Sequence, residues 1–327
     1  MKAAYIEQTG PADSIIVGDL PKPKLGPGQV LVRVRAAAFN PIDLYMRSGA
    51  VAMPLPFPYI VGTDFAGTVE ALGEGASRFT VGDRVWGSNQ GMIGRQGAAS
   101  EYAAVDETLA YRTPDGHSDV EAAAQALVGI TAHLGLFRHA KLQSGETVYV
   151  PGGSGGVGSM VVQMAKAKGA RVATSAGSPD RVELCRTLGA DLALDYKTDD
   201  IPARLREFAP EGFDVWYETQ REPNLEVSVP LLRARGRMII IAGRTAKPVI
   251  PIGSLYTRNC SLLGFAMFNA SPDEQRHAAN EITQWAESGH LKPLIGQIFP
   301  LDDAAAAQRA MEENKVESAG KVVLEVG

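Results

Sequence analysis

The sequence predicts an α/β protein made of a β-rich domain and a doubly wound parallel sheet. Three observations support this prediction: short β-like runs between glycine and proline turns in the first third, alternating helices and strands after it, and a glycine-rich turn between a strand and a helix. The length of 327 residues allows two domains of roughly 150 residues, each able to bury a core.

Short β-like runs dominate the first part of the chain, up to about residue 120. Residues 29–35 alternate in part between apolar and polar side chains, and residues 67–72 end at the turn-forming residues 73–75. Three prolines in residues 54–58 exclude a continuous helix, because each removes an N–H donor and restricts its predecessor. This segment is either a rigid surface loop or part of a substrate mouth.

From about residue 120 the chain alternates between helix and strand. Residues 120–138 read as one or two helices. The predicted strands are 147–150, 171–174, 190–195, 213–217 and 237–242, with helices at 159–168 and 180–188. Such alternation implies a parallel sheet with helices on both faces.

The last part of the chain is less regular. Residues 273–288 and 304–313 predict amphipathic helices, and residues 321–326 predict a strand. This strand has no partner in the α/β half, so we expect it to rejoin the β-rich half.

Composition and charge exclude several classes of protein. Hydrophobic residues make up 45% of the chain and charged residues 21%, an ordinary globular mixture. The formal charge of -5 lacks the basic excess that nucleic acids select, so we expect no nucleic-acid partner. No apolar run approaches the roughly 20 residues that span a bilayer, and we expect no signal peptide, because residues 1–5 already read as a strand. With only two cysteines, we expect a cytoplasmic protein without a membrane partner.

The strongest motif is G-x-G-x-x-G, formed by Gly153, Ser154, Gly155, Gly156, Val157 and Gly158. It follows a predicted strand and opens a predicted helix, the context in which this motif binds a dinucleotide. The glycines allow a tight turn, a close approach of pyrophosphate and close helix packing, while the helix N-terminus offers free N–H groups. The alternative is a tight turn without a ligand.

The residues after the second strand of the α/β half select the dinucleotide. An NAD site places Asp or Glu there, about 20 residues after the motif, to bind the ribose 2′-hydroxyl. Residues 174–181 place no acid at the tip of the strand and offer small and hydroxyl side chains with Arg181. Since a guanidinium binds a 2′-phosphate, the sequence favours NADPH. The alternative is that Arg181 binds no phosphate and is only a solvated residue in the first turn of the following helix.

The sequence predicts no metal site. His117, His133, His139, His277 and His290 are scattered, and we find no two at a zinc-binding spacing beside a cysteine or carboxylate. Reduction of a simple ketone commonly uses a Lewis acid to stabilise the alkoxide. In a quinone or an enone, the negative charge brought by the hydride is spread over the conjugated system. Hydrogen bonds are then sufficient to stabilise it without a metal ion.

These residues resemble the zinc-independent medium-chain dehydrogenase/reductases, in particular the quinone oxidoreductase and zeta-crystallin branch. The loop at residues 150–158 is similar to the A/G-S-G-G-V-G loop of that family, and the resemblance covers nearly the whole chain in order. Zinc-dependent relatives carry Gly-His-Glu where this chain has Gly62-Thr63-Asp64, and their cysteine ligand is missing near Ala37. Further similar segments are residues 40–49, 58–69, 82–86, 100–103 and 289–293.

The resemblance implies a GroES-like catalytic domain and a Rossmann domain that binds NADP. The catalytic domain would comprise residues 1–120 and 266–327, and the Rossmann domain residues 121–265. The resemblance also implies an active site in the cleft between the domains and a homodimer formed by edge strands of the Rossmann sheets.

It further implies which residues line the site. Asn40 and Tyr45 match residues beside the nicotinamide and the substrate, and Thr131 matches a threonine beside the nicotinamide. The other matches are Gly177, Ser178 and Arg181 at the 2′-phosphate, Tyr196 on the adenosine side, and Gly243, Arg244 and Thr245 after the fifth strand.

Two segments depart from the family pattern. Residues 218–224 replace a D-S-V-G-like turn, which weakens the transfer of cofactor contacts there. Residues 87–99 match no family segment, and their glycines suggest a mobile loop at the cleft.

The leading hypothesis is an NADPH-dependent quinone oxidoreductase in which Tyr45 and Asn40 orient or hydrogen-bond the acceptor oxygen. Tyr45 as a proton donor is a further hypothesis, and an aromatic side chain packed without chemistry is its alternative. A second hypothesis is reduction of an enone, alkenal or enoyl double bond. A third is a zeta-crystallin-like, non-catalytic protein that binds NADPH or RNA, which the acidic charge balance disfavours.

Overall fold

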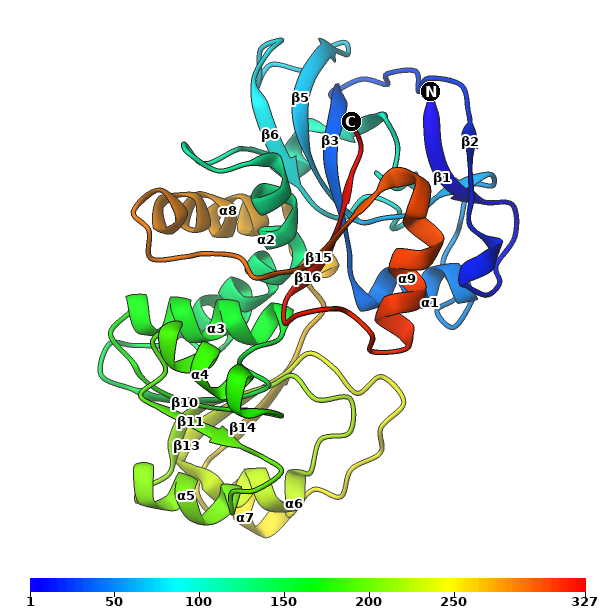
Figure 1. The fold of residues 1–327 in the computed structure, drawn as a ribbon. Coiled ribbons are helices and arrows are strands. Elements are labelled where there is room, and N and C mark those ends of the chain that lie inside the picture. The colour runs from blue at the N-terminus through cyan, green and yellow to red at the C-terminus, as the bar shows by residue number, and fades with distance from the viewer. The chain divides into compact units, whose positions relative to one another are not determined.

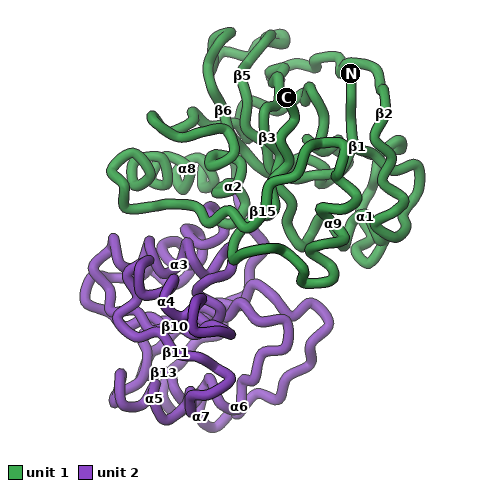
Figure 2. The backbone as a smooth tube through the Cα atoms, viewed as in Figure 1, with its two compact units in different colours: residues 1–128, 271–327 green, residues 129–270 purple.

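The computed structural model describes all of residues 1–327. The chain forms two compact units, unit 1 of residues 1–128 with 271–327 and unit 2 of residues 129–270 (Figure 2). The first boundary lies inside helix α2 (Asp119–His133), and the second lies directly before α8 (Pro272–Glu287). Both fall a few residues later in the chain than the predicted domain limits at residues 120 and 265.

Unit 1 contains two β-sheets (Figure 1). The larger has seven strands in the order β15-β16-β3-β5-β6-β8, with β7 paired to β3, and the smaller has three in the order β2-β1-β4. The strands are β1 (Lys2–Ile6), β2 (Ile16–Asp19), β3 (Gln29–Phe39), β4 (Tyr59–Ile60), β5 (Asp64–Leu72), β6 (Arg84–Gly87), β7 (Tyr102–Asp106), β8 (Ala110–Arg112), β15 (Ile295–Pro300) and β16 (Lys321–Glu325). The predicted β-rich first domain is confirmed.

The strand β16 returns to the first part of the chain, as the sequence predicts. It pairs antiparallel with β3, where Val323 lies opposite Ala38, and parallel with β15. It therefore occupies an inner place in the larger sheet.

One continuous apolar core connects the larger sheet of unit 1 to helix α9 (Ala304–Glu312). Val32 and Val34 of β3, Phe65 of β5 and Ala307 of α9 are all buried in it. Burial of each large apolar side chain contributes about 1.5–3 kcal/mol. The partial alternation of residues 29–35 ends there, because residues 36–39 at the end of β3 are all buried.

The helices of unit 1 begin at recognisable start signals. Helix α1 (Pro41–Ser48) has proline at its first position, where the missing N–H costs nothing. Helix α8 begins with a capping box, in which Ser271 accepts from Glu274 N while the Glu274 side chain accepts from Ser271 N. Both helices predicted after residue 265 are confirmed.

Unit 2 contains one parallel sheet of six strands in the order β11-β10-β9-β12-β13-β14. Numbered along the chain, this is the order 3-2-1-4-5-6 of the Rossmann fold, which confirms the predicted doubly wound sheet. The order reverses beside β9, so ligands are expected at the carboxyl ends of β9 and β12. The strands are β9 (Thr147–Pro151), β10 (Arg171–Ala176), β11 (Leu192–Asp195), β12 (Phe213–Glu218), β13 (Leu232–Ile240) and β14 (Ser261–Gly264).

The helices of unit 2 connect these strands. They are α3 (Gly156–Ala167), α4 (Pro179–Thr187), α5 (Ile201–Phe208), α6 (Leu225–Ser228) and α7 (Ile252–Tyr256). Helix α3 begins three residues before the predicted helix at residue 159, inside the glycine motif itself.

Helix α2 and the π-helical turn after it (Leu134–His139) form one apolar segment. This segment, Asp119–His139, has 21 residues, and an 18-residue window within it has a mean hydropathy of 1.4, with 78% of that window buried within the structure. By length and composition alone this segment passes for a membrane span. Its burial is that of a core helix, which makes the support for a membrane span weak.

Candidate functional site

The glycine loop joins β9 to α3 at the point where the strand order of unit 2 reverses. Gly152 adopts a left-handed φ of 73°, which turns the chain out of β9. A Cβ atom on Gly153 would lie 2.1 Å from Thr174 Oγ1, and one on Gly158 would lie 2.1 Å from Gly152 O. Close packing of the loop against β10 and against α3 therefore requires glycine at both positions.

The exposed end of this loop leaves room for an anion. Gly155 is the N-cap of α3, no side chain caps this end, and a Cβ there would lie 3.2 Å from its nearest neighbour, Gly152 O. The first α-helical hydrogen bond runs from Ser159 N to Gly155 O at 2.9 Å. The N–H groups of Gly156, Val157 and Gly158 precede it, so they have no partner within the helix and are available to an anion, while Ser154 is buried.

The end of β10 forms the second part of the site in unit 2. A Cβ on Gly177 would lie 2.3 Å from Tyr196 Oη, so this hydroxyl lies directly against Gly177. Ser178 is the N-cap of α4, and its side chain makes no capping hydrogen bond. Arg181 follows in the first turn, exposed and without an ion pair, beside the exposed Asp180. The structure thus brings the predicted 2′-phosphate residues together.

Thr131 lies on α2, and its hydroxyl is buried without a hydrogen-bond partner in the chain. Its backbone carbonyl accepts a 2.7 Å hydrogen bond from Tyr217 Oη, which ties α2 to β12. Because buried hydroxyl groups normally have a partner, the open Oγ1 is a candidate contact for a ligand.

The end of β12 supplies two residues of the segment 218–224 that the sequence analysis did not assign to the site. Thr219 Oγ1 donates to Pro151 O at 2.6 Å and so ties this end to the start of the glycine loop. The buried Glu218 accepts from Trp216 Nε1 at 3.0 Å and from Gln220 N at 2.8 Å. Burial raises the pKa of Glu218, and these hydrogen bonds oppose the rise. The turn at residues 218–224, which departs from the family pattern, therefore supports the glycine loop through the hydrogen bond from Thr219 to Pro151.

Gly243 lies after β13 with a left-handed φ of 82°. A Cβ there would lie 3.2 Å from Arg221 O and 3.3 Å from Pro223 Cδ, so the loops after β12 and β13 touch. Arg244 and Thr245 are exposed on this loop. The predicted residues of this loop thus follow the carboxyl end of β13, the edge where this fold binds its ligand.

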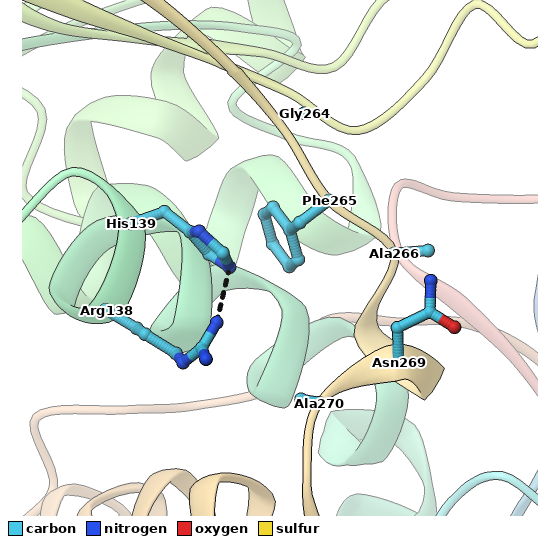
Figure 3. A pocket seen from close by; sticks show the side chains of 7 residues that line it. All are labelled: Arg138, His139, Gly264, Phe265, Ala266, Asn269 and Ala270. Carbon is cyan, nitrogen blue, oxygen red and sulfur yellow. Dashed lines mark hydrogen bonds between the residues drawn. The ribbon is translucent and has the colours of Figure 1, made fainter.

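A small hollow opens in unit 2 after the carboxyl end of β14 (Figure 3). Its volume is about 210 Å³. His139 stacks on Phe265 with ring centroids 4.4 Å apart, and its Nε2 lies 3.3 Å from Arg138 Nη1. Asn269 adds an amide on the opposite side in Figure 3. The sequence analysis named His139 only as a scattered histidine and did not name Arg138, Phe265 or Asn269.

In unit 1, Asn40 lies at the centre of a buried polar cluster. Its Nδ2 donates to Thr63 Oγ1 at 2.9 Å and to Asp64 Oδ2 at 2.7 Å, and its Oδ1 accepts from Lys321 Nζ. Ser88 Oγ donates to Asp64 Oδ1 at 2.6 Å. Asn40 is 1% exposed, so its side chain is committed to partners inside the protein. This geometry favours a positioning role for Asn40 over direct contact with an acceptor.

The same cluster contains two carboxyl groups and one amine, all buried. Burial raises the pKa of Asp43 from 3.8 to about 7, and the nearby Asp64 adds to the rise. Asp43 Oδ2 accepts from Asn40 N and Thr63 Oγ1, while its Oδ1 has no partner. Burial also raises the pKa of Asp64 and lowers that of Lys321, and the opposite charges of the two oppose both shifts.

Tyr45 lies on α1, half-buried, one turn after the helix begins. Asn40, the N-cap of α1, and Tyr45 therefore lie in one short contiguous segment, which is why the sequence alone could identify both. Lys321 gave no such signal, because its partners Phe39, Asn40 and Asp64 are 282, 281 and 257 residues away.

The loop at residues 87–99 is held by many hydrogen bonds, which does not fit the expected mobile loop. Gln96 accepts from Ile60 N at 2.7 Å and donates to Pro56 O and Pro58 O at 2.9 and 2.8 Å. Asn89 Nδ2 donates to Gln275 Oε1 on α8 at 2.7 Å. The loop and the proline segment at residues 54–58 thus form one connected structure in unit 1.

One pair of potential metal ligands was passed over in the sequence. His277 and Glu281 are four residues apart on α8, so they lie on one helix face.

Two family models match the chain in the regions of the two units. The alcohol dehydrogenase GroES-like domain matches residues 26–115, and the zinc-binding dehydrogenase domain matches residues 156–284.

Similar proteins cover nearly the full length. The quinone oxidoreductase of Rattus norvegicus is 31% identical over 96% of this chain and 93% of its own. The 2-methylene-furan-3-one reductase of Solanum lycopersicum is 32% identical over 99% of this chain and 79% of its own.

Among solved structures, an NAD-dependent alcohol dehydrogenase superposes with a TM-score of 0.91 at 31% identity, over 100% of both chains. A mycobacterial protein complexed with NADPH superposes with a TM-score of 0.87 at 29% identity, also over 100% of both.

A β-rich unit and a Rossmann unit with a glycine-rich dinucleotide loop define an oxidoreductase of the alcohol dehydrogenase type. The chain belongs to the medium-chain dehydrogenase/reductase family, in its quinone oxidoreductase branch.

Proposed function

We propose that this protein is an NADPH-dependent reductase that transfers a hydride to a quinone or a related conjugated carbonyl without a metal ion. One observation carries the choice of cofactor. Arg181 stands exposed and unpaired beside Gly177, Ser178 and Tyr196 at the end of β10, where an NAD site has a carboxylate. The solved mycobacterial relative in complex with NADPH supports this choice.

The residues of unit 2 fit a dinucleotide by their own geometry. The uncapped start of α3 at Gly155 accepts a pyrophosphate, and Arg181 and Ser178 accept a 2′-phosphate. The open Thr131 Oγ1 is suited to hydrogen-bond the nicotinamide end. When bound, NADPH supplies a hydride from its nicotinamide ring.

In unit 1, Tyr45 orients the acceptor through a hydrogen bond from its hydroxyl, and Asn40 fixes the start of the helix that carries Tyr45. Charge that reaches a conjugated carbonyl is spread over the ring or double bond, so a hydrogen bond is sufficient to stabilise it. The carboxylate of Asp64, where zinc-dependent relatives have glutamate, is already occupied by Lys321, Asn40 and Ser88. This arrangement supports catalysis without a metal ion.

A second candidate is reduction of an enone carbon–carbon double bond, favoured by the similarity to the tomato 2-methylene-furan-3-one reductase. The purified protein should be assayed with NADPH against a panel of quinones and of enones and alkenals of matched size. A larger kcat/KM for quinones supports the first function, and a larger value for enones supports the second. Absence of turnover with every acceptor contradicts both.

A third candidate, a protein that binds NADPH or RNA without catalysis, is disfavoured by the net charge of -5. A gel-shift assay with RNA at low salt tests it, because retardation of the RNA without any reductase activity would support this candidate alone. We expect neither nucleic acid nor a membrane as a partner, and a cytoplasmic location.

We also propose that the protein is a homodimer. Strand β14 is an edge strand of the six-stranded sheet, and the segment before it exposes Val249, Ile252 and Tyr256 at 63%, 59% and 68%. Exposed apolar side chains beside an open strand edge mark an interaction surface. Light scattering should give the mass of two chains, and Ile252→Asp should lower it to that of one.

A further inference from the structure

The amino group of Lys321 is enclosed by oxygen atoms in the interior of unit 1. Lys321 is 5% exposed, and its Nζ donates to Phe39 O at 2.7 Å, to Asn40 Oδ1, and to Asp64 Oδ2 at 3.3 Å. Three acceptors match the three N–H donors of an ammonium ion. The geometry therefore fits a charged lysine paired with a charged Asp64.

These three contacts join elements that are far apart in the sequence. Lys321 begins β16, Phe39 ends β3, and Asp64 begins β5. Asn40 is the N-cap of α1. One side chain therefore fixes the point at which the chain leaves the larger sheet and enters α1.

The start of α1 is held both by its own cap and by this cluster. Asn40 and Asp43 form a capping box, and the Asn40 Nδ2 and Oδ1 atoms also have partners in the cluster. Asp43 closes the helix start by accepting from Asn40 N at 2.7 Å. Tyr45 follows two residues later, so its placement is set by the same atoms.

We propose that Lys321 is a positioning residue of the reductase, which fixes Asn40 and the start of α1 and so holds Tyr45 in its working position. This inference rests on the proposed function of Tyr45. A buried ion pair is often no more stabilising than apolar residues of the same size, so a gain in geometric precision explains its presence better than a gain in stability.

The test compares removal of the charge pair with removal of a surface pair. Lys321→Met with Asp64→Asn removes both members of the buried charge pair together, and Asp43 remains as the titratable group of the cluster. The control is Lys2→Met with Asp302→Asn, which removes an ion pair that is 45% and 61% exposed in the same unit. Each variant is assayed for kcat, for KM of the acceptor, and for NADPH affinity by nicotinamide fluorescence.

In the Lys321/Asp64 variant we expect kcat to fall about 10- to 100-fold, because small misplacements of a positioning group have effects of that size. NADPH affinity should stay within about twofold, since its site is built by unit 2, and the control should keep its kcat. A kcat equal to that of the unchanged protein would overturn the proposal. If the double variant does not fold, Lys321→Gln replaces it, with the same expected loss and the same contrary outcome.

A second measurement does not need any turnover. Hydrogen–deuterium exchange of the peptide that contains α1 should be faster in the Lys321/Asp64 variant than in the control, while exchange in β9 and β10 is unchanged. Unchanged exchange of α1 would overturn the positioning role even if every candidate acceptor fails. Faster exchange in a protein without reductase activity would refute the proposed function and leave the structural role of Lys321 standing.

Discussion

Thr174 on β10 fills the space in front of Gly153, so a Cβ at position 153 would lie 2.1 Å from the Thr174 hydroxyl. That hydroxyl in turn donates to Val150 O at 2.6 Å. The first glycine of the motif therefore serves close packing between neighbouring strands, and the left-handed turn is made by Gly152, which precedes the motif. At the start of α3, a Cβ on Gly155 would have Gly152 O, at 3.2 Å, as its one near neighbour.

This division of roles predicts opposite effects of two alanine substitutions. Gly153→Ala should destabilise the protein by about 1–3 kcal/mol, because it overpacks the contact with Thr174. Gly155→Ala should leave the melting temperature nearly unchanged and weaken NADPH binding, because its Cβ enters the space for the pyrophosphate. Thermal unfolding and fluorescence titration check both. A Gly153→Ala protein as stable as the unchanged one would contradict the packing argument.

Replacement of Arg181 tests the choice of cofactor. Arg181→Asp should weaken NADPH binding about 10- to 100-fold, as the loss of a charged hydrogen bond costs about 1.5–3 kcal/mol. NADH binding should change little, because NADH lacks the 2′-phosphate. The control is Arg186→Asp, the same charge change near the other end of α4. Equal losses for NADPH and NADH would show that the phosphate pocket lies elsewhere.

Replacement of Tyr45 tests the acceptor side. Tyr45→Phe should lower kcat/KM for the acceptor about 10- to 100-fold, because one hydrogen bond to a developing charge is lost. NADPH affinity should be unchanged. Tyr102→Phe removes the hydroxyl of another half-buried tyrosine of unit 1, on β7, and serves as the control. Full activity of Tyr45→Phe would remove both its orienting and its proton-donating role.

The raised pKa of Asp43, from 3.8 to about 7, predicts a dependence of stability on pH. Between these values the folded protein keeps a proton that the unfolded chain releases, so stability falls as the pH rises through this window. The slope reaches about 1.4 kcal/mol per pH unit for one proton. Urea unfolding at pH 5 and pH 8 should show a smaller difference in Asp43→Asn than in the unchanged protein.

The charged neighbours of Asp43 set the size of this effect. The charge of Asp64 raises the pKa of Asp43, and the charge of Lys321 lowers it. Tyr59 is a further titratable neighbour, since burial and then the charge of Asp43 raise its pKa. An equal pH dependence in Asp43→Asn would assign the titration to Asp64 instead.

Local signals in the sequence predicted much of unit 2. The glycine motif was found because the strand, the turn and the helix that define it are contiguous. The position of Arg181 was found for the same reason, since it lies directly after β10. Helix α3 began earlier than predicted because Gly156 and Val157 adopt helical geometry that their composition disfavours.

The polar cluster of unit 1 was found only in part. Asn40 was named from a short segment, but Lys321 is a single cation before an apolar strand, and its partners come from distant strands. The loop at residues 87–99 was expected to move because of its glycines, and its restraints come from Tyr59, Gln275 and the proline segment. Pairings over such distances depend on the completed fold.

The inner place of β16 between β15 and β3 has a consequence for synthesis. Residues 129–270 leave the ribosome before Lys321 does, so the nascent Rossmann sheet has all its strands while the older, N-terminal sheet still has an open edge at β3. The segment made first is thus among the last to mature, and during that interval β3 is exposed to chaperones or to wrong pairing.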